Sequence, residues 1–314
     1  MAEWRLLFLG ATLLALSGLF LAWNLRPPFG FILSLRAEKL AALVLVGAAT
    51  GAATVIFQTI AANRLLTPGI VGFDALFVFI QTGLVMVLGG AAFNAVPELP
   101  KFFAETLLLV GAAMALFGLL FRKGAEDIIR MILTGVILGV LLRGLAQFAQ
   151  RLLEPSEFAV VQQATIASFN TVEAGKLWIG GAMLGLALLG AWRLSPALDV
   201  AALGRNKARS LGLRHDRLVM GGLAIVAVLV SVSTALVGPV TFLGLLAASL
   251  AHAALKVHRH AMLIPATSLI GAAILVAGQV VFERLFGLQS ALAIIVEFAG
   301  GLLFLTLVLR RRQQ

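Results

Sequence analysis

The chain contains no cysteine, and charged residues make up only 12% of its 314 positions. The absence of cysteine excludes disulfides, thiolate metal ligands and cysteine nucleophiles. The small share of charge accompanies 61% hydrophobic residues and a mean hydropathy of +1.05, which is far from the composition of an ordinary soluble domain. The composition therefore indicates a polytopic membrane protein.

Apolar runs long enough to cross a bilayer recur along the whole chain. A hydrocarbon core about 30 Å thick needs roughly 20 apolar residues per helix. Runs of this kind, separated by proline, glycine or charge, predict an all-α fold with about ten transmembrane helices; the eighth is short, and nine or eleven spans are the alternatives. No intervening stretch is long enough for a second domain, so residues 1–314 are expected to form one integral membrane domain. The expected spans are 4–23, 39–61, 70–93, 101–121, 128–153, 177–194, 217–237, 242–255, 261–281 and 288–309.

Lys and Arg are distributed unevenly between the two sets of loops that ten spans create. Most of them fall on the side that also holds both termini. Because positive residues concentrate in cytoplasmic loops, this predicts that both termini are cytoplasmic. The net charge of +10 then reflects topology and contact with anionic membrane lipid, and a nucleic-acid partner is not indicated.

Basic charge is densest in the loop at about 195–216, between the sixth and seventh spans. Small apolar residues are interleaved with these charges, and Gly204 and Gly212 act as breaks. The pattern predicts a short amphipathic helix outside the membrane. Such a helix suits docking into a groove on a partner protein, because small residues permit close approach and basic residues fix orientation. An ordinary solvated loop is the alternative.

Within this loop, "ALGRNKARSLGL" resembles a segment of the FecCD-type family, the permease subunits of iron-siderophore and cobalamin ABC importers. Four further stretches resemble the family in the same order along the chain, so the likeness extends over about residues 35–310. The departure "GFDALFVF" resembles a subgroup of siderophore permeases that includes the petrobactin type. The other stretches are "ANRLLTPGIVG", "RMILTGVILGVLLRGL", "VGPVTFLGLLAASLAH" and "LIPATSLIGAAIL".

The resemblance implies a type II ABC importer permease fold in the bacterial inner membrane, crossing it many times. It implies a second permease copy or a paralogue, two cytoplasmic ATPase subunits and a periplasmic or lipid-anchored siderophore-binding protein. The cargo would be a ferric siderophore moved by alternating access; heme, cobalamin, zinc and manganese are the alternative cargoes. The chain lacks a G-x-x-x-x-G-K-[ST] phosphate loop, so ATP and Mg²⁺ would be used by the partner ATPase. No enzyme activity, cofactor, catalytic residue or metal ligand is expected in the chain itself.

The resemblance also assigns residues to two docking surfaces. On the cytoplasmic side it implies contact with the ATPase. On the outer side "LRAEK" stands where the family has basic residues that meet the binding protein; anchoring of a helix end at the lipid headgroups is the alternative reading. The ATPase-coupling residues are Ala201, Leu203, Gly204, Arg205, Lys207, Ala208, Arg209, Ser210, Leu211 and Gly212, and the binding-protein residues are Arg36, Lys39 and Arg284.

Arg143 lies deep in the fifth expected span, where a charged residue is costly unless it faces a cavity or a partner. Arg143, Gln147, Gln150 and Arg151 recur at i, i+4, i+7 and i+8 and therefore share one helical face. This predicts a polar stripe along the translocation path of an anionic chelate. The alternative is a pairing of Arg143 with Glu297. An ion-coupled secondary transporter would instead use Arg143, Glu297 and Asp74 as its ion or proton site.

The segment "HAALKVHRH" holds three of the four histidines, at 252, 258 and 260. No acidic residue is close to them in the sequence. We therefore interpret the segment as a solvated cytoplasmic loop in preference to a metal site.

Overall fold

The computed structural model describes residues 2–25, 27–121, 128–170, 172–287 and 292–311, and within these ranges it contains helices and no strand. Two π-helical segments, η1 and η2, each continue directly into or from a longer helix. The elements in chain order are α1 (Ala2–Ala22), α2 (Phe29–Ile60), η1 (Gly69–Phe73), α3 (Asp74–Leu88), α4 (Gly90–Ala95), α5 (Glu98–Phe121), α6 (Ile128–Gln150), α7 (Pro155–Thr165), α8 (Ala174–Arg193), α9 (Ser195–Ala201), α10 (Arg205–Ser210), α11 (His215–Val237), α12 (Leu243–Leu255), α13 (His260–Gln279), η2 (Val280–Leu285) and α14 (Leu292–Arg311).

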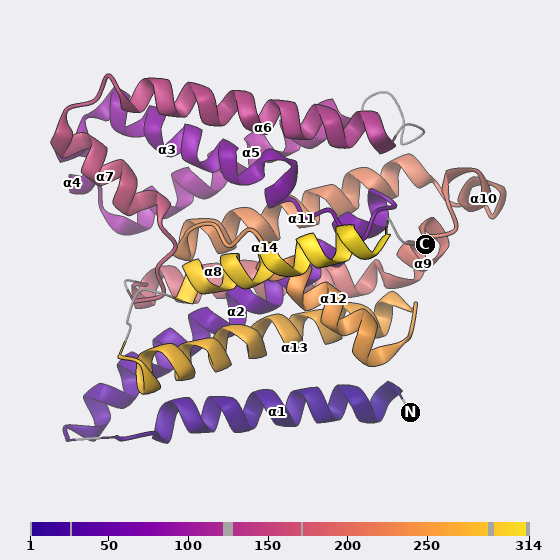
Figure 1. Cartoon of the computed structure of the whole chain (residues 1–314), viewed down its shortest axis with the longest axis horizontal. Helices are drawn as coiled ribbons and strands as arrows, with labels where there is room; N and C mark the ends of the chain where they lie inside the picture. Colours follow the sequence, from indigo (N-terminus) through magenta and orange to yellow (C-terminus); the bar gives the residue numbers. More distant parts are fainter. Residues whose placement is uncertain (1, 26, 122–127, 171, 288–291, 312–314) are drawn as a thin grey trace.

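The long helices run side by side along one direction (Figure 1). The start of α1, the end of α14 and the short helices α9 and α10 lie at one end, whereas α4, α7 and the turn between α1 and α2 lie at the other. Among the described residues, eight helices are long and apolar enough to span a membrane, and α12 and α14 contribute shorter apolar stretches. The expected all-α membrane fold is confirmed, including the short eighth span.

Helix α2 is longer than the sequence predicts. It has 32 residues and begins at Phe29, ten residues before the expected boundary. Arg36 lies inside this helix and is buried, and its Nη1 donates hydrogen bonds to the carbonyls of Leu21 and Trp23 at 2.7 and 2.9 Å. The last carbonyls of a helix have no partner within the helix, so Arg36 caps α1 and joins it to α2.

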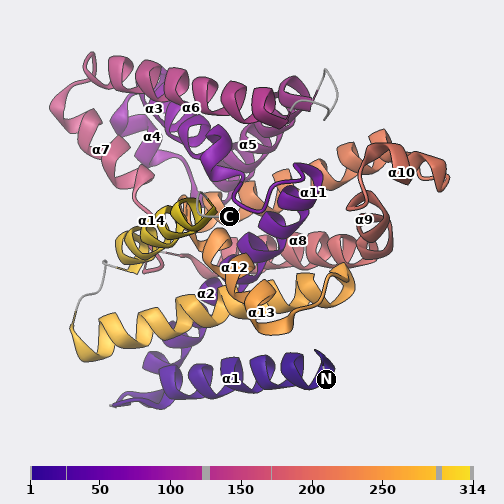
Figure 2. The ribbon, with the colours of Figure 1, turned by 45° about the vertical axis from the view of Figure 1, so that its right-hand side comes forward.

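Helices α2, α11 and α13 form the centre of the bundle (Figure 2). A Cβ atom at Gly47 or Gly51 of α2 would overlap the backbone of Ala272 or Thr267 on α13. The two helices are therefore in backbone contact. Close packing of this kind drives helix association in a bilayer, where lipid tails are as apolar as the side chains.

Helix α6 packs against the side of the bundle through a second set of glycines. A Cβ at Gly135 would overlap the side chain of Val71, and Gly139 lies against the backbone of Gly72 in η1. Gly72 has φ +109°, a conformation that L side chains rarely adopt. The rest of α6 is largely exposed.

The segment between α11 and α12 turns back into the bundle. Gly238 ends α11 with φ +93°, and the N–H of Ser168 donates to the carbonyl of Val237 at 2.7 Å. This turn brings Thr241 against α3 and α14, where it contacts two acidic side chains.

Candidate functional site

The basic loop folds as two short helices, α9 and α10, separated at Gly204. Gly204 and Gly212 have φ +94° and +81°, in the region that favours glycine, so the two predicted breaks are confirmed. The predicted short helix is present between them as α10, and a second short helix, α9, precedes Gly204. The left-handed conformation of Gly204 turns the chain before Arg205, and the small residues are divided between the two helices.

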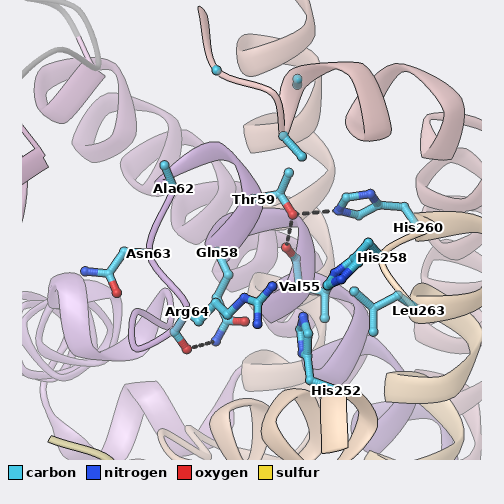
Figure 3. A pocket seen from close by; sticks show the side chains of 13 residues that line it. Val55, Gln58, Thr59, Ala62, Asn63, Arg64, His252, His258, His260 and Leu263 are labelled. Atoms are coloured by element: carbon cyan, nitrogen blue, oxygen red, sulfur yellow. Dashed lines mark hydrogen bonds between the residues drawn. The ribbon is translucent and has the colours of Figure 1, made fainter. Parts of the chain in front are cut away.

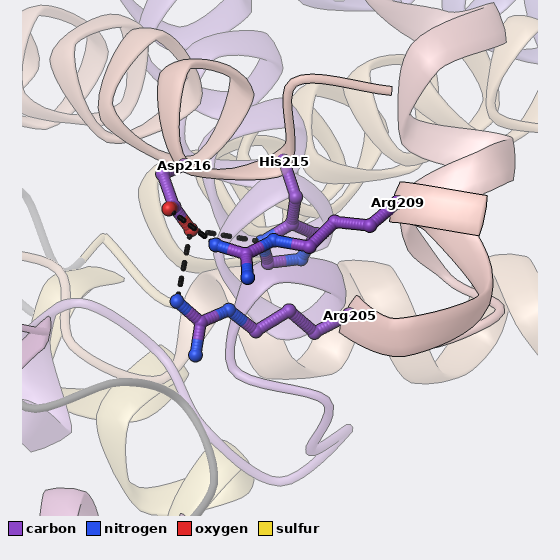
Figure 4. A network of polar contacts seen from close by, with 4 residues as sticks. All are labelled: Arg205, Arg209, His215 and Asp216. Carbon is purple, nitrogen blue, oxygen red and sulfur yellow. Dashed lines mark hydrogen bonds and ion pairs between the residues drawn. The ribbon is translucent and has the colours of Figure 1, made fainter. Parts of the chain in front are cut away.

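Two arginines of α10 fold back onto the next helix (Figure 4). Arg209 Nη2 donates to Asp216 Oδ2 at 2.6 Å, and Arg205 Nη2 donates to Asp216 Oδ1 at 3.4 Å. Asp216 belongs to the first turn of α11 and is 64% exposed, so solvent weakens both pairs. The pairs orient α10 against α11 more than they stabilise the fold.

The side chains of α10 and its flanks divide between a buried and an exposed set. Ala208 is fully buried, so α10 packs closely against the rest of the protein at this point. Ala201, the last residue of α9, is also buried. Leu203 and Leu211 are 53% and 65% exposed. Lys207 and Ser210 are also exposed, and Ser210 Oγ donates to the carbonyl of Asn206 at 3.0 Å. The end of the molecule thus presents an apolar and basic surface.

The base of this element is joined to the two central helices. The Oδ1 of Asp199 in α9 accepts from the N–H of His260 at 2.8 Å and lies 2.6 Å from its Nδ1. The other ring nitrogen of His260 lies 2.7 Å from the hydroxyl of Thr59 in α2. Asp199 and Asp216 were not among the residues predicted for this site. Asp216 had a signal in its closeness to Arg209, whereas Asp199 is 61 residues from its partner.

Arg143 and Gln147 are brought together on α6. Both side chains are exposed, and both line a cavity of about 340 Å³ between α6 and η1. Gln150 has a different environment, because its Nε2 donates to the hydroxyl of Thr82 on α3 at 3.0 Å. Arg151 follows the end of α6 and is exposed. The four residues therefore share a face in sequence, but only Arg143 and Gln147 line this cavity.

Two acidic side chains meet near this cavity. The Thr241 hydroxyl donates to Asp74 Oδ2 at 2.5 Å and lies 3.4 Å from Glu297 Oε1. Arg143 interacts electrostatically with both carboxyl groups, although the described residues include no direct ion pair between Arg143 and Glu297. Over the same part of the chain, no three His, Asp or Glu side chains are arranged to hold a metal ion.

The basic residues expected to meet a binding protein are engaged within the chain. Arg36 caps α1, and Lys39 Nζ forms an ion pair of 2.5 Å with Glu283 in which both side chains are about five-sixths buried. Gln279 Nε2 donates to the same Glu283 oxygen at 2.6 Å. Arg284 lies in η2, and its side chain is outside the described residues. Neither Arg36 nor Lys39 therefore offers an exposed cation to a binding protein.

Comparisons with known proteins give consistent results over nearly the whole length. The profile of the FecCD transport family matches residues 5–310. The chain is 40% identical to the petrobactin import system permease protein YclO of Bacillus subtilis (strain 168), over 94% of both chains. It is 31% identical to the petrobactin import system permease protein FatC of Bacillus anthracis, over 91% of this chain and 81% of that one.

The fold has a counterpart among solved structures. A structure described as an inward-facing conformation of a metal-chelate type ABC transporter superposes with a TM-score of 0.84 at 23% identity, covering 98% of this chain and 99% of the other. At that identity the likeness concerns the fold, and it agrees with the arrangement of helices described above.

Proposed function

The chain belongs to the FecCD transport family, and from that membership we propose that it is the permease subunit of an ABC importer that takes up a ferric siderophore. The observation that carries the proposal is the family match from residue 5 to 310 together with 40% identity to a petrobactin permease. Petrobactin itself, or a chelate of similar chemistry, is the proposed cargo.

The proposed assembly is that of a binding-protein-dependent importer in the bacterial inner membrane. Two permease copies, or this chain and a paralogue, enclose the path; two ATPase subunits bind the end that carries α9 and α10; and a siderophore-binding protein delivers cargo at the opposite end. Both termini then face the cytoplasm, in agreement with the excess of Lys and Arg predicted for that side. ATP and Mg²⁺ are used by the ATPase, and this chain performs no catalysis.

The proposed coupling runs through α9 and α10. The exposed Leu203, Lys207 and Leu211 contact the ATPase. The Asp216 pairs hold α10 in orientation, and the contacts of Asp199 with His260 carry displacement of α9 to α13. Because His260 also contacts Thr59, α2 moves with it. Closure of the ATPases would thereby tilt packed helices as rigid bodies.

The proposed path passes the cavity beside Arg143 and Gln147. A guanidinium in this position suits a ferric siderophore whose carboxylate or catecholate arms make it anionic. A charged side chain exposed at this depth is costly in lipid, so the exposed face of α6 is expected to line water or to meet the second permease.

A pull-down tests the coupling element. The detergent-solubilised permease is incubated with its candidate ATPase, and wild type is compared with a variant in which residues 203–212 are replaced by a Gly/Ser linker. Loss of the ATPase from the variant alone supports the proposal. A linker replacement of residues 155–165, at the opposite end of the molecule, serves as the control and is expected to retain the ATPase. Failure of folded wild type to recruit any ATPase would overturn the importer assignment.

The cluster of Asp74, Thr241 and Glu297 beside Arg143 favours one second candidate, an ion-coupled secondary transporter. The two functions differ in their energy source. Uptake into vesicles that depends on ATP and survives a protonophore supports the importer. Uptake without ATP that collapses with the proton gradient would support the secondary transporter.

A further inference from the structure

A cavity of about 260 Å³ opens at the end of the molecule that carries α9 and α10 (Figure 3). It lies between the end of α2 with the turn that follows, the end of α9, and the connection from α12 to α13. Residues far apart in the sequence therefore meet in it. The lining consists of Val55, Gln58, Thr59, Ala62, Asn63, Arg64, Ala201, Ala202, Gly204, His252, His258, His260 and Leu263.

The lining carries basic groups and, among the described residues that form it, no carboxylate. Arg64 and His258 are exposed, and neither side chain makes an ion pair within the described part of the chain. His252 lies close enough to Arg64 and His258 to interact with both electrostatically. The interpretation of this segment as a solvated loop holds for His258, which is exposed, whereas His252 lies in α12 and His260 is buried. All three histidines line one cavity with Arg64.

Asp199 of α9 is already engaged by His260, which lines the cavity. The Thr59 hydroxyl donates its one proton to the carbonyl of Val55 at 2.9 Å, so it accepts from His260 Nε2 at 2.7 Å. The Nδ1 of His260 lies 2.6 Å from Asp199 Oδ1. Asp199 is thus held by the backbone N–H and the ring of His260 and forms no ion pair with Arg64 among the described residues. It leaves the charge of Arg64 uncompensated.

Gln58 and His252 complement the cations in different ways. Gln58 is buried at 5% exposure, and its Nε2 donates to the carbonyl of Arg64 at 2.6 Å, which fixes the turn that carries the arginine. Its Oε1 is buried and has no hydrogen-bond partner in the structure. That oxygen is closed off from the cavity. The acceptor that the cavity offers is His252 Nε2, because His252 Nδ1 donates to the carbonyl of Ala248 at 2.8 Å. A ligand here needs a hydroxyl as well as negative oxygens.

We propose that this cavity binds a phosphate-type oxyanion that also carries a hydroxyl group. The anionic oxygens contact Arg64 and His258, and the hydroxyl donates to His252 Nε2. A simple carboxylate lacks that donor. Inorganic phosphate has both groups, as does the headgroup of phosphatidylglycerol, in which the phosphodiester is joined to a glycerol bearing free hydroxyls. The shared chemistry is a phosphate with an adjacent O–H.

Occupation of the cavity has a structural consequence. Ala201, Ala202 and Gly204 form part of its wall, so a bound phosphate contacts the hinge between α9 and α10 as well as α2 and the connection before α13. The ligand would hold the coupling element against the bundle. The site itself does not depend on the proposed transport function, and it is tested by binding.

The first arm of the test uses inorganic phosphate and delipidated permease in a phosphate-free detergent buffer. Equilibrium dialysis measures binding by wild type, Arg64→Gln and His258→Gln. Each substitution removes a charge-assisted hydrogen bond and is expected to weaken binding by about tenfold or more. Arg259→Gln is the matched control, because Arg259 is the exposed neighbour of His258 and does not line the cavity.

The second arm separates a lipid source from a free anion. Permease is reconstituted with phosphatidylglycerol or with phosphatidylcholine, and lipid retained after extraction is measured by native mass spectrometry. Retained phosphatidylglycerol that is lost in Arg64→Gln and kept in Arg259→Gln identifies the headgroup. Saturable phosphate binding with the same pattern identifies the free anion. Absence of both, or equal binding by wild type and both cavity variants, overturns the proposal; thermal melting of each variant confirms that it is folded.

Discussion

Helices α1 and α6 are equally exposed, and their exposed faces differ in kind. In each helix, only 11% of the residues in the most apolar 18-residue stretch are buried. The exposed face of α1 is apolar along its length, with Phe8 and Leu14 as examples, and its charges are confined to the first turns. The exposed face of α6 includes Arg143 and Gln147 in mid-span. Exposure in a single chain therefore does not identify what covers a surface.

The physical difference lies in the cost of charge in lipid. A centrally placed arginine costs about 2.5–3.5 kcal/mol on insertion scales, unless it meets water or a partner. Helix α1 fits a lipid environment throughout. Helix α6 fits a boundary with a second permease or with the translocation path, and this contrast can be broken or sharpened by matched substitutions.

The largest effect is expected from placing a new arginine on each helix. Leu14 of α1 is 74% exposed and Val140 of α6 is 68% exposed, so the two sites are matched. Leu14→Arg should cost about 2.5–3.5 kcal/mol of insertion free energy because it faces lipid. Val140→Arg should insert nearly normally. Protein in the membrane fraction measures both, and equal losses would contradict the distinction between the helices.

A smaller effect is expected from filling a glycine contact. Gly135→Val on α6 would overlap Val71 and should destabilise the protein by about 1–3 kcal/mol through overpacking. Gly18→Val on α1 is the control, because nothing lies within 4 Å of a Cβ placed there. Thermal unfolding in detergent measures the difference. A Gly135→Val protein as stable as the control would show that α6 is not held by this contact.

The next effect concerns transport. Arg143→Gln removes the mid-span charge and should lower ferric-siderophore uptake by about tenfold, the equivalent of one charge-assisted hydrogen bond to cargo. ATPase recruitment should be unchanged. Arg151→Gln changes an exposed arginine just beyond the end of α6 and should have a weaker effect. Uptake that is unaltered by Arg143→Gln would return this arginine to a structural role.

The smallest effect is expected at the packed side of α6. Gln150→Leu removes the 3.0 Å hydrogen bond to Thr82 and should cost about 0.5–1.5 kcal/mol of stability. Gln147→Leu, on the cavity side, should leave thermal stability nearly unchanged while it alters uptake. The opposite pattern would mean that the two glutamines have exchanged roles.

The membrane fold could be predicted from the sequence because a transmembrane helix is determined by the length and composition of a local stretch. The start of α2 could not be predicted in this way. Arg36 and Lys39 end an apolar window in sequence, yet in the structure α1 carbonyls satisfy one and Glu283 satisfies the other. Partners this distant along the chain are invisible to a window of 20 residues.

The candidate site could likewise be predicted only where it depends on local sequence. The conformations of Gly204 and Gly212 follow from local sequence, since glycine tolerates a left-handed backbone. The pairing of Asp199 with His260 and the meeting of Arg64 with His252 and His258 arise from tertiary packing. The separation of Gln150 from Arg143 likewise depends on where α3 lies.

The length of α2 bears on how the protein sits in bilayers of different thickness. Its 32 residues extend about 48 Å, against a hydrocarbon core of about 30 Å. Even at a tilt of about 40°, near the upper limit for such helices, it projects beyond that core. Phe29, Phe31 and Leu33 at its first turns are exposed and apolar. This helix therefore holds a reserve of apolar length that a thicker membrane can cover, whereas the 21 residues of α1 offer none. Hydrophobic mismatch would consequently be taken up by α1 and the lipid around it.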